Sequence, residues 1–436
     1  MDGVKLLLYC YIIVAIIPFF WQNKSGFFLF RLDVFLSITL LPYAVSIPIN
    51  YLYFGNDSLG MSENRVFLTL LFHFFFLSSF LVGFYSFLPR KYLFPSTQNI
   101  IASDSYHLPN ILIKFSFAFI LILTIIYFQK LGGIVQYFNI DRLVRYSKTQ
   151  DNHLGVFSIG IIMARTIMLL YLSKNEIKGL QSNNKVYKWV NMMLIILYAA
   201  VNLAVGDRRF LVGLIIAECF IFNFFGKLKN KIIYIIGLVG GILMQLFQYL
   251  RHIANDPAAM VQHFDQNSEL KWLDISKGEY ANAYLIFNSI LESPIEYQFG
   301  MTYLKSFSLF FPHFILPNRF EGLPIWFVKT YYYDVYSLGG GFAFNFVAET
   351  YLNFGYIGPI IIGVILGWLF RKFWIYVFFK STTSYSLTCY AMFLPSIFIL
   401  GRVDFGGGFK EYLTSVLLPL GAIYLLFLEF NKLKIK

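Results

Sequence analysis

Polar side chains recur at helical spacing near residue 350, in a stretch that is otherwise apolar. Asn345, Glu349 and Asn353 are four residues apart, so a helix would place all three on one face. A carboxylate near membrane depth is costly unless it faces a cavity or a partner. Glu349 is therefore a candidate general base, a ligand for hydroxyl groups, or half of a buried Arg–Glu pair that holds helices in register.

Two glycine runs directly precede apolar helical stretches. They read Leu-Gly-Gly-Gly-Phe over 338–342 and Phe-Gly-Gly-Gly-Phe over 405–409. Glycines ahead of a helix N-terminus leave backbone N–H groups open to an anion, and the helix dipole favours negative charge there. We expect an anion site at Gly339, Gly340 and Gly341, and a second glycine turn at 405–409. Alternatively, the glycines only break the chain at the membrane surface.

Arginine is concentrated in segments that the topology below places outside the membrane. Its planar fork binds phosphate and carboxylate through two parallel hydrogen bonds, so this distribution suggests a polyanionic ligand. The same arginines could instead bind lipid headgroups or pair with acidic residues. The arginines considered as ligand contacts are Arg142, Arg145, Arg208, Arg209, Arg251, Arg319 and Arg402.

Two further residues have side chains suited to acid–base chemistry. His313 lies in a proline-containing segment that ends at Arg319, and Asp334 lies in an aromatic stretch from Trp326 to Tyr336. The rings of that stretch could stack on sugars or form an interfacial belt.

The composition excludes an ordinary soluble enzyme, a disordered chain and a fibre. Hydrophobic residues make up 58% of the 436 residues and charged residues only 13%, against roughly 25% charged in soluble domains. The chain has 51 Phe and 31 Tyr, more than a water-exposed surface accommodates. These values indicate an all-α, polytopic integral membrane protein.

Apolar runs long enough to cross a bilayer predict about eleven transmembrane helices. The first run has no small-residue cleavage site after it, so we expect a membrane anchor there. The expected spans cover residues 4–21, 33–53, 66–88, 111–129, 156–173, 190–205, 210–226, 232–250, 343–370, 383–400 and 411–429.

Lysine and arginine in the short loops set the orientation. The basic loops and the basic C-terminal tail fall on one side if the spans alternate, so that side is the cytoplasm and the N-terminus is outside. The expected parts are a first transmembrane bundle over 1–250 with an external loop at 130–155, a large external loop over 251–342, and a C-terminal transmembrane bundle over 343–436.

Nothing in the sequence indicates a metal or a nucleotide. There is no Walker motif or dinucleotide fingerprint. Cys10, Cys219 and Cys389 each lie in an apolar run, with no histidine at metal-ligand spacing. We expect no cofactor, no nucleic-acid partner, and contact with membrane lipids.

The region around Glu349 resembles the Wzy-type oligosaccharide repeat-unit polymerases of bacterial surface polysaccharides, the O-antigen and capsule polymerases. The resemblance rests on the glycine run before Phe342, on Ala-Glu-Thr-Tyr-Leu-Asn-Phe-Gly-Tyr-Ile-Gly over 348–358, and on the apolar span that follows. The segment ending at Arg319 is also similar to the family's segment ahead of that turn. An arginine–glycine signature of some members, with ten residues between the two, is not cleanly present here, since nine residues separate Arg145 from Gly155.

The resemblance implies glycosyl transfer at the outer face of the bacterial cytoplasmic (inner) membrane. The donor would be a growing glycan on undecaprenyl diphosphate, and the acceptor a lipid-linked repeat unit. Undecaprenyl diphosphate would be released, and a separate chain-length regulator is an implied partner protein. Glu349 would accept the proton of the acceptor hydroxyl, with Arg319, His313 and Asp334 as further catalytic candidates. The other arginines considered above, the glycines at 339–341, Asn345, Asn353 and Tyr351 would contact substrate.

Other functions remain open at this point. A lipid-linked glycan flippase or exporter would need a polar pathway across the bilayer, and mid-span charges are few, with Lys114, Arg165 and Glu218 the main ones. An O-antigen ligase uses the same donor with another acceptor, which the sequence does not distinguish. A non-enzymatic scaffold of an envelope-polysaccharide complex would use its arginines only for docking.

Overall fold

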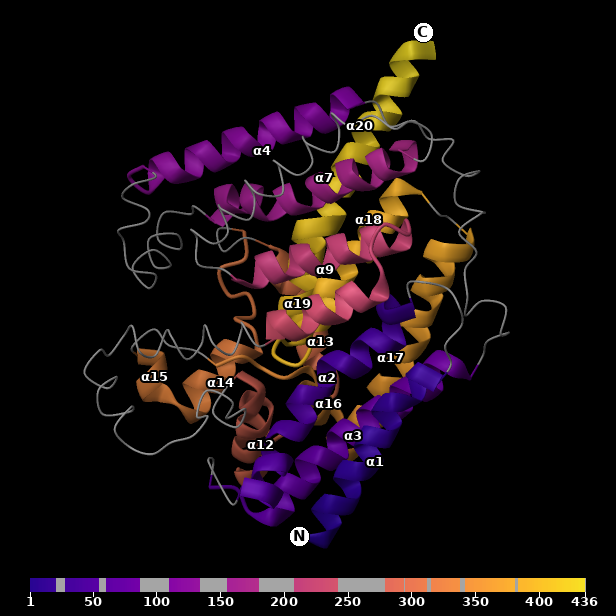
Figure 1. Cartoon of the computed structure of the whole chain (residues 1–436). Helices are drawn as coiled ribbons and strands as arrows, with labels where there is room; N and C mark the ends of the chain where they lie inside the picture. Colours follow the sequence, from indigo (N-terminus) through magenta and orange to yellow (C-terminus); the bar gives the residue numbers. More distant parts are fainter. Residues whose placement is uncertain are drawn as a thin grey trace, which may run out of the picture. The chain divides into compact units, whose positions relative to one another are not determined.

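The structure is a computed structural model of the chain. It describes residues 1–20, 28–54, 60–86, 110–133, 155–179, 208–241, 279–293, 295–311, 315–337, 342–380 and 383–435. Throughout these ranges the regular structure is helical and no strand occurs, as the composition predicts. A further apolar helix, without a label in Figure 1, runs over Asn230–Gly241. The labelled elements, with η for 3-10 and π turns, are α1 (Asp2–Phe20), η1 (Phe28–Phe30), α2 (Leu32–Ile49), η2 (Asn50–Phe54), α3 (Glu63–Tyr85), α4 (Asn110–Lys130), α7 (Gly155–Gly179), α9 (Arg208–Phe224), η6 (Glu279–Ala281), α12 (Asn282–Glu292), α13 (Met301–Ser306), η7 (Phe307–Phe310), α14 (Leu323–Tyr331), α15 (Tyr333–Ser337), α16 (Phe346–Phe354), η8 (Gly355–Ile357), α17 (Gly358–Ile375), η9 (Tyr376–Lys380), α18 (Ser384–Phe398), α19 (Phe405–Tyr412), η10 (Leu413–Leu417) and α20 (Leu418–Ile435).

Five helical stretches in the described ranges are long and apolar enough to cross a membrane. Each coincides with an expected span, and α4, α7, α9, α18 and the helix over Asn230–Gly241 lie on further ones. The expected span 190–205 lies outside the described residues, so the number of spans stays a prediction. The five stretches are Asp2–Phe20, Leu32–Tyr53, Glu63–Tyr85, Phe346–Lys380 and Phe405–Leu428.

The chain forms two compact units whose segments alternate along the sequence. This division does not test the boundaries expected at residues 250 and 342, which stay a prediction. The described part of the expected external loop 251–342 contains the helices α12, α13, α14 and α15. Unit 1 comprises Met1–Leu88, Gly226–Arg371 and Phe398–Gly407, and unit 2 comprises Pro89–Phe225, Lys372–Ile397 and Gly408–Lys436.

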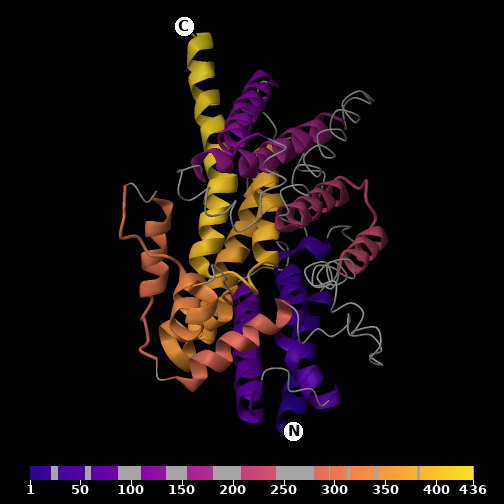
Figure 2. The ribbon, with the colours of Figure 1, turned by 90° about the vertical axis from the view of Figure 1, so that its left-hand side faces the viewer.

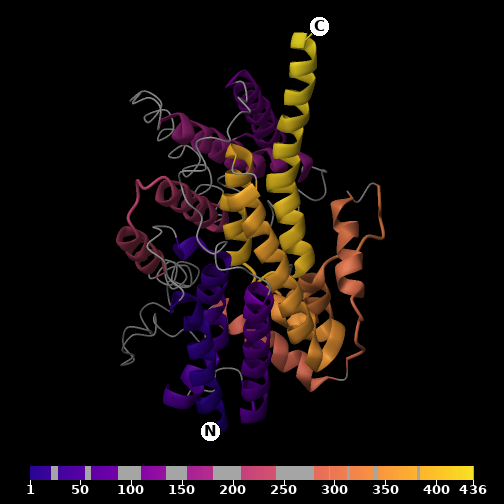
Figure 3. The same ribbon diagram turned by 90° about the vertical axis from the view of Figure 1, so that its right-hand side faces the viewer.

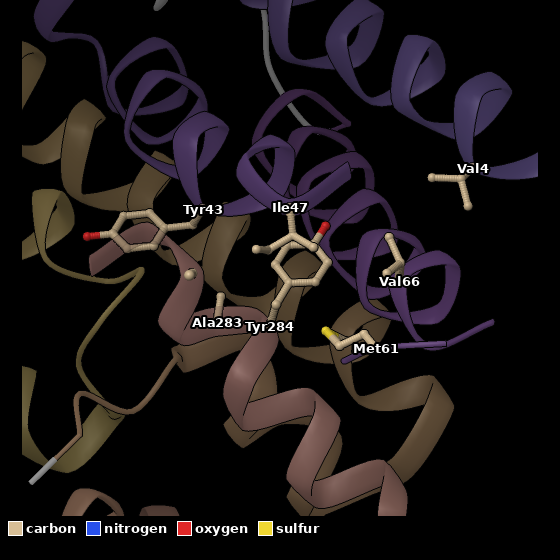
Figure 4. Close-up of a cluster of buried hydrophobic side chains, with 8 residues drawn as sticks. Val4, Tyr43, Ile47, Met61, Val66, Ala283 and Tyr284 are labelled. Atoms are coloured by element: carbon tan, nitrogen blue, oxygen red, sulfur yellow. The ribbon is translucent and has the colours of Figure 1, made fainter. Parts of the chain in front are cut away.

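Unit 1 is built on α1, α2 and α3, which pack side by side (Figures 1 and 3). Figure 4 shows α12 adding its apolar face to this bundle, with Ala283 and Tyr284 next to Tyr43 and Ile47 of α2. Tyr284 is fully buried, and its hydroxyl donates to the carbonyl oxygen of Ala44 at 2.6 Å. Burying a tyrosine is tolerated here because its hydroxyl has a backbone partner.

Helices α3 and α17 approach so closely that their backbones touch. A Cβ on Gly363 would lie 2.0 Å from Ser79 Oγ, and one on Gly367 would lie 2.1 Å from the Phe80 carbonyl oxygen. Ser79 also donates to the carbonyl oxygen of Pro359 at 3.2 Å. Gly363 and Gly367 form a small-xxx-small pair, the pattern that allows transmembrane helices to pack without intervening side chains.

The expected span 343–370 coincides with the candidate span Phe346–Lys380, which is built from more than one α-helix. Within the expected bounds it consists of α16, the 3-10 turn η8 and α17, with Gly355 directly after α16. Gly355 has φ +62°, a left-handed conformation that glycine adopts without a Cβ penalty. The break separates a short buried helix, α16, from the longer apolar helix that follows.

Unit 2 packs α4 against α7, with α20 alongside both, as Figure 2 shows. Its interior includes an ion pair between Arg165 of α7 and Glu411, whose Nη2 and Oε1 are 3.6 Å apart. Ser173 and Thr388 share a hydrogen bond of 3.2 Å in the same unit. Arg165, one of the mid-span charges of the sequence, is thus paired with a carboxylate.

Candidate active site

Helix α16 begins at a capping asparagine. Asn345 Oδ1 accepts hydrogen bonds from the N–H groups of Val347 at 2.6 Å and Ala348 at 3.3 Å. Its amide nitrogen donates to the Gly401 carbonyl oxygen at 3.1 Å. Asn345 therefore satisfies free N–H groups of the first turn and ties that turn to the segment ahead of α19.

Glu349 is fully buried one turn later and accepts two hydrogen bonds from uncharged donors. Its Oε1 accepts from the Thr302 hydroxyl at 2.8 Å, and its Oε2 accepts from the Phe405 N–H at 2.6 Å. Phe405 is the first residue of α19, so the positive end of that helix faces the carboxylate. Among the described residues no arginine or lysine pairs with Glu349, so the Arg–Glu pair considered above does not form there.

Asn353 continues the same face and completes a polar cluster with Thr302. Its amide nitrogen donates to Thr302 Oγ1 at 2.7 Å, and its carbonyl oxygen accepts from the Gly300 N–H at 2.9 Å. Both side chains are buried, as is Asn345. The sequence-based expectation of a shared polar face is confirmed for Glu349 and Asn353, because both contact Thr302.

Asp404 is a second buried carboxylate close to Glu349, and it is not among the residues predicted from the sequence. It interacts electrostatically with Glu349, and its oxygens accept from the N–H groups of Leu323 at 3.3 Å and Gly407 at 3.2 Å. Burial raises the pKa of the Asp404 carboxyl above its usual range, although these N–H groups oppose the effect. The signal in the sequence was an Asp ahead of a glycine run, in the position of a helix N-cap.

The second glycine run is not a turn ahead of a helix, which corrects that expectation. Phe405 to Phe409 belong to α19, and two of the N–H groups there donate to Asp404 and Glu349. A Cβ on Gly406 would lie 2.5 Å from Ser306 Oγ, so glycine lets α13 approach α19 closely. The anion expected at such a helix start is supplied by the protein's own carboxylates.

Tyr303 lies beside the Glu349 carboxylate. Its ring packs against those of Phe354 and Phe405, with centroids 6.5 and 5.4 Å away. Its hydroxyl is buried near Glu349 and Asn353, and burial raises the pKa of that hydroxyl, so it stays protonated. Tyr303 therefore brings a neutral O–H group close to Glu349, and its ring is held by a stacked contact with Phe354 and an edge-on contact with Phe405.

Four other predicted site residues lie in the described ranges with their side chains. Arg319 is half-buried, and its Nη1 donates to the Phe311 carbonyl oxygen at 2.8 Å. Asp334 is exposed in α15. Tyr351 is buried among the rings of other aromatic residues instead of facing Glu349. Arg402 is half-buried just before Asp404.

Other predicted residues are not covered by the described ranges. Arg208 and Arg209 start α9, as expected for that turn, but the positions of their side chains are not described. The predicted residues that lie outside the described ranges are His313, Arg142, Arg145, Arg251, Gly339, Gly340 and Gly341.

The aromatic stretch from Trp326 to Tyr336 is partly internal. Tyr332 packs on Phe342 and shares a hydrogen bond with Ser289, whereas Tyr333 is 67% exposed. Within the described ranges no group of three or more histidine, cysteine or acidic side chains could hold a metal ion. The chemistry that the arrangement offers is proton transfer at a pair of carboxylates.

We expect Asn345→Ala to destabilise the protein by about 1 kcal/mol or more, because the first turn of α16 loses its cap and the link to Gly401 is lost. The midpoint of thermal unfolding in detergent is the measurement. Asn318→Ala, at an exposed asparagine, is the matched control. Equal midpoints for the two variants would contradict the capping role.

The family comparison covers nearly the whole chain. Residues 3–434 match the family model described as O-antigen polysaccharide polymerase Wzy. The chain belongs to this family. No curated protein and no solved structure matches the chain. Membership confirms the resemblance seen around Glu349 and identifies a transmembrane protein of polysaccharide biosynthesis, whose family polymerises O-antigen repeat units.

Proposed function

We propose that the protein joins undecaprenyl-diphosphate-linked repeat units into a surface polysaccharide at the outer face of the inner membrane. The observation that carries the proposal is the buried acidic cluster around Glu349, in a chain that matches the polymerase family over residues 3–434. The cluster lies at one end of a candidate membrane span, where a lipid-linked sugar would be presented.

The proposed reaction is one glycosyl transfer. The bond between the anomeric carbon of the growing chain and its diphosphate breaks, and a bond from that carbon to a hydroxyl oxygen of the incoming unit forms. The hydroxyl proton passes to a protein base, and undecaprenyl diphosphate leaves with the electron pair. A diphosphate is a stable leaving group, so the protein has to position both lipids and stabilise charge.

Glu349 is the proposed base. Its carboxylate is held by the neutral donors of Thr302 and Phe405, which leaves it able to take up a proton. Glu349 is enclosed in the described conformation. Contact with a sugar hydroxyl therefore requires that α13, the helix of Thr302, moves away from it. Catalytic contacts of this kind often tighten only once substrate is bound.

Arg319 is the proposed diphosphate ligand among the described residues. Its Nη1 is fixed by the Phe311 carbonyl oxygen, which orients the planar guanidinium. A guanidinium oriented in this way presents its remaining N–H groups in a fork that matches phosphate oxygens.

Arg319→Lys should lower polymer formation about tenfold or more, because lysine keeps the charge but loses the paired N–H groups. The measurement is incorporation of labelled repeat units by membranes. Arg65→Lys is the matched control, because Arg65 already donates to Asn288 Oδ1 at 2.8 Å. Wild-type incorporation by Arg319→Lys would move Arg319 to a structural role.

We expect a reporter fused after Lys436 to report the cytoplasm, because the tail carries Lys432, Lys434 and Lys436. Alkaline phosphatase and green fluorescent protein fusions give opposite readouts. A periplasmic signal would place the proposed active site on the cytoplasmic side and would contradict the proposed outer-face reaction.

The function itself is tested by deleting the gene and separating the surface glycan on a gel, beside a complemented strain. A ladder reduced to single repeat units on the acceptor lipid supports the polymerase. Loss of surface glycan with lipid-linked units retained inside favours a flippase. Full-length polymer that stays on undecaprenyl diphosphate favours a ligase, and an unchanged ladder contradicts all three.

A further inference from the structure

One described segment of the expected external loop has an unusual distribution of side chains. The segment is residues 297–311, which we call the α13 segment, and it contains α13 and η7. Its polar residues Thr302 and Ser306 are buried, whereas Phe299 is 76% and Leu304 64% exposed. A helix in water places its polar face outward, so this segment is reversed.

The exposed residues form one continuous face. Met301, Leu304, Phe307 and Phe311 recur at spacings of three and four, and all are exposed. Lys305 is the one charged residue between Tyr297 and Phe311. Its long apolar stem allows the ammonium group to reach a membrane surface from such a position.

The α13 segment starts next to a candidate membrane span, Phe346–Lys380. The N–H groups of Gln298 and Phe299 donate to the carbonyl oxygens of Leu352 and Asn353, at 3.0 and 2.9 Å, so the α13 segment starts beside the end of α16. An exposed apolar row with a spacing of four residues begins there at Ile357, the last residue of η8, which is 59% exposed, and continues along α17. The row consists of Ile357, Ile361, Ile365 and Leu369.

We propose that the outer face of the α13 segment lies against the acyl chains of the bilayer. Polar residues then face the protein interior and apolar residues face hydrocarbon, as in membrane-embedded helices. The segment is an in-plane element that extends the lipid-contacting surface of α17 around the end of α16. This inference is independent of the proposed reaction, because it rests on exposure, polarity and backbone contacts alone.

Spin-label accessibility in reconstituted vesicles tests the proposal. Cys10, Cys219 and Cys389 are replaced by alanine, and a single nitroxide is placed at Leu304 or Phe307. Molecular oxygen concentrates in hydrocarbon, whereas a nickel chelate stays in water. We expect high oxygen and low nickel accessibility at both positions.

Three labelled controls define the scale. Ile361 of α17 reports lipid, exposed Thr330 of α14 reports water, and buried Ser306 reports the protein interior. A value like that of Thr330 at Leu304 and Phe307 would show an aqueous loop and overturn the proposal. Low accessibility to both reagents, as at Ser306, would show that another part of the protein or a partner covers the face, and would also overturn it. A monodisperse elution profile before reconstitution confirms that each labelled variant is folded.

Discussion

We expect Glu349→Gln to abolish long-chain polymer, with a loss of about 10²-fold or more in transfer rate, because an amide has no carboxylate to accept the hydroxyl proton. Glutamine retains the shape and one carbonyl oxygen, which can still accept from the Phe405 N–H. The protein should therefore remain folded and inserted. The measurement is the length distribution of surface glycan in a deletion strain that carries the variant.

Two further variants separate chemistry from structure at Glu349. Thr302→Val removes the hydroxyl that donates to Oε1 but leaves the carboxylate, so activity should fall less than in Glu349→Gln. Glu292→Gln alters an exposed glutamate that pairs with Arg65 and should leave the ladder unchanged. If Glu349→Gln produced a normal ladder, the proposed base would have to be another residue.

Gly363→Leu should prevent most of the protein from folding, because the free energy of unfolding falls by on the order of 3 kcal/mol or more. A Cβ at this position would lie 2.0 Å from Ser79 Oγ and 2.8 Å from the Phe76 carbonyl oxygen. The contact partners include the backbone, which cannot move aside as a flexible side chain can, so α3 and α17 would have to separate. The yield of monodisperse protein after detergent extraction and its unfolding midpoint are the measurements.

Gly421→Leu is the matched control for this prediction. Gly421 lies in α20, and no atom lies within 4 Å of an added Cβ at this position. Gly421→Leu raises the hydropathy of the chain by the same amount as Gly363→Leu. We expect near wild-type yield and stability. If both leucine variants behaved alike, the backbone contact between α3 and α17 would not contribute to stability.

The sequence predicts most helix positions in the described ranges, because long apolar runs have few other solutions in a membrane. It does not predict the break at Gly355, since the apolar run continues through it and only the backbone conformation reveals the turn. The contact between Gly363 and α3 is missed for a related reason. A small-residue pair in an apolar helix indicates close packing only once its partner is known.

Part of the polar cluster around Glu349 could be predicted from the sequence. The spacing of Glu349 and Asn353 indicated a shared face, because helical periodicity is a local property. Thr302 and Asp404 lie 47 and 55 residues from Glu349 along the chain, and no local pattern links them to it. The second glycine run was assigned to a turn because glycine disfavours helices, whereas here it is helical and allows α13 to pack closely.

α13 separates two environments by the thickness of one helix. Thr302 on its inner face contacts Glu349, and under the proposal made above its outer face contacts lipid. A helix with its side chains is about 10 Å across. The first sugar of an isoprenoid-anchored substrate would then reach the carboxylate while its tail stays in the bilayer. Both substrates would meet by lateral diffusion in two dimensions, and the membrane itself would set their concentration at the site.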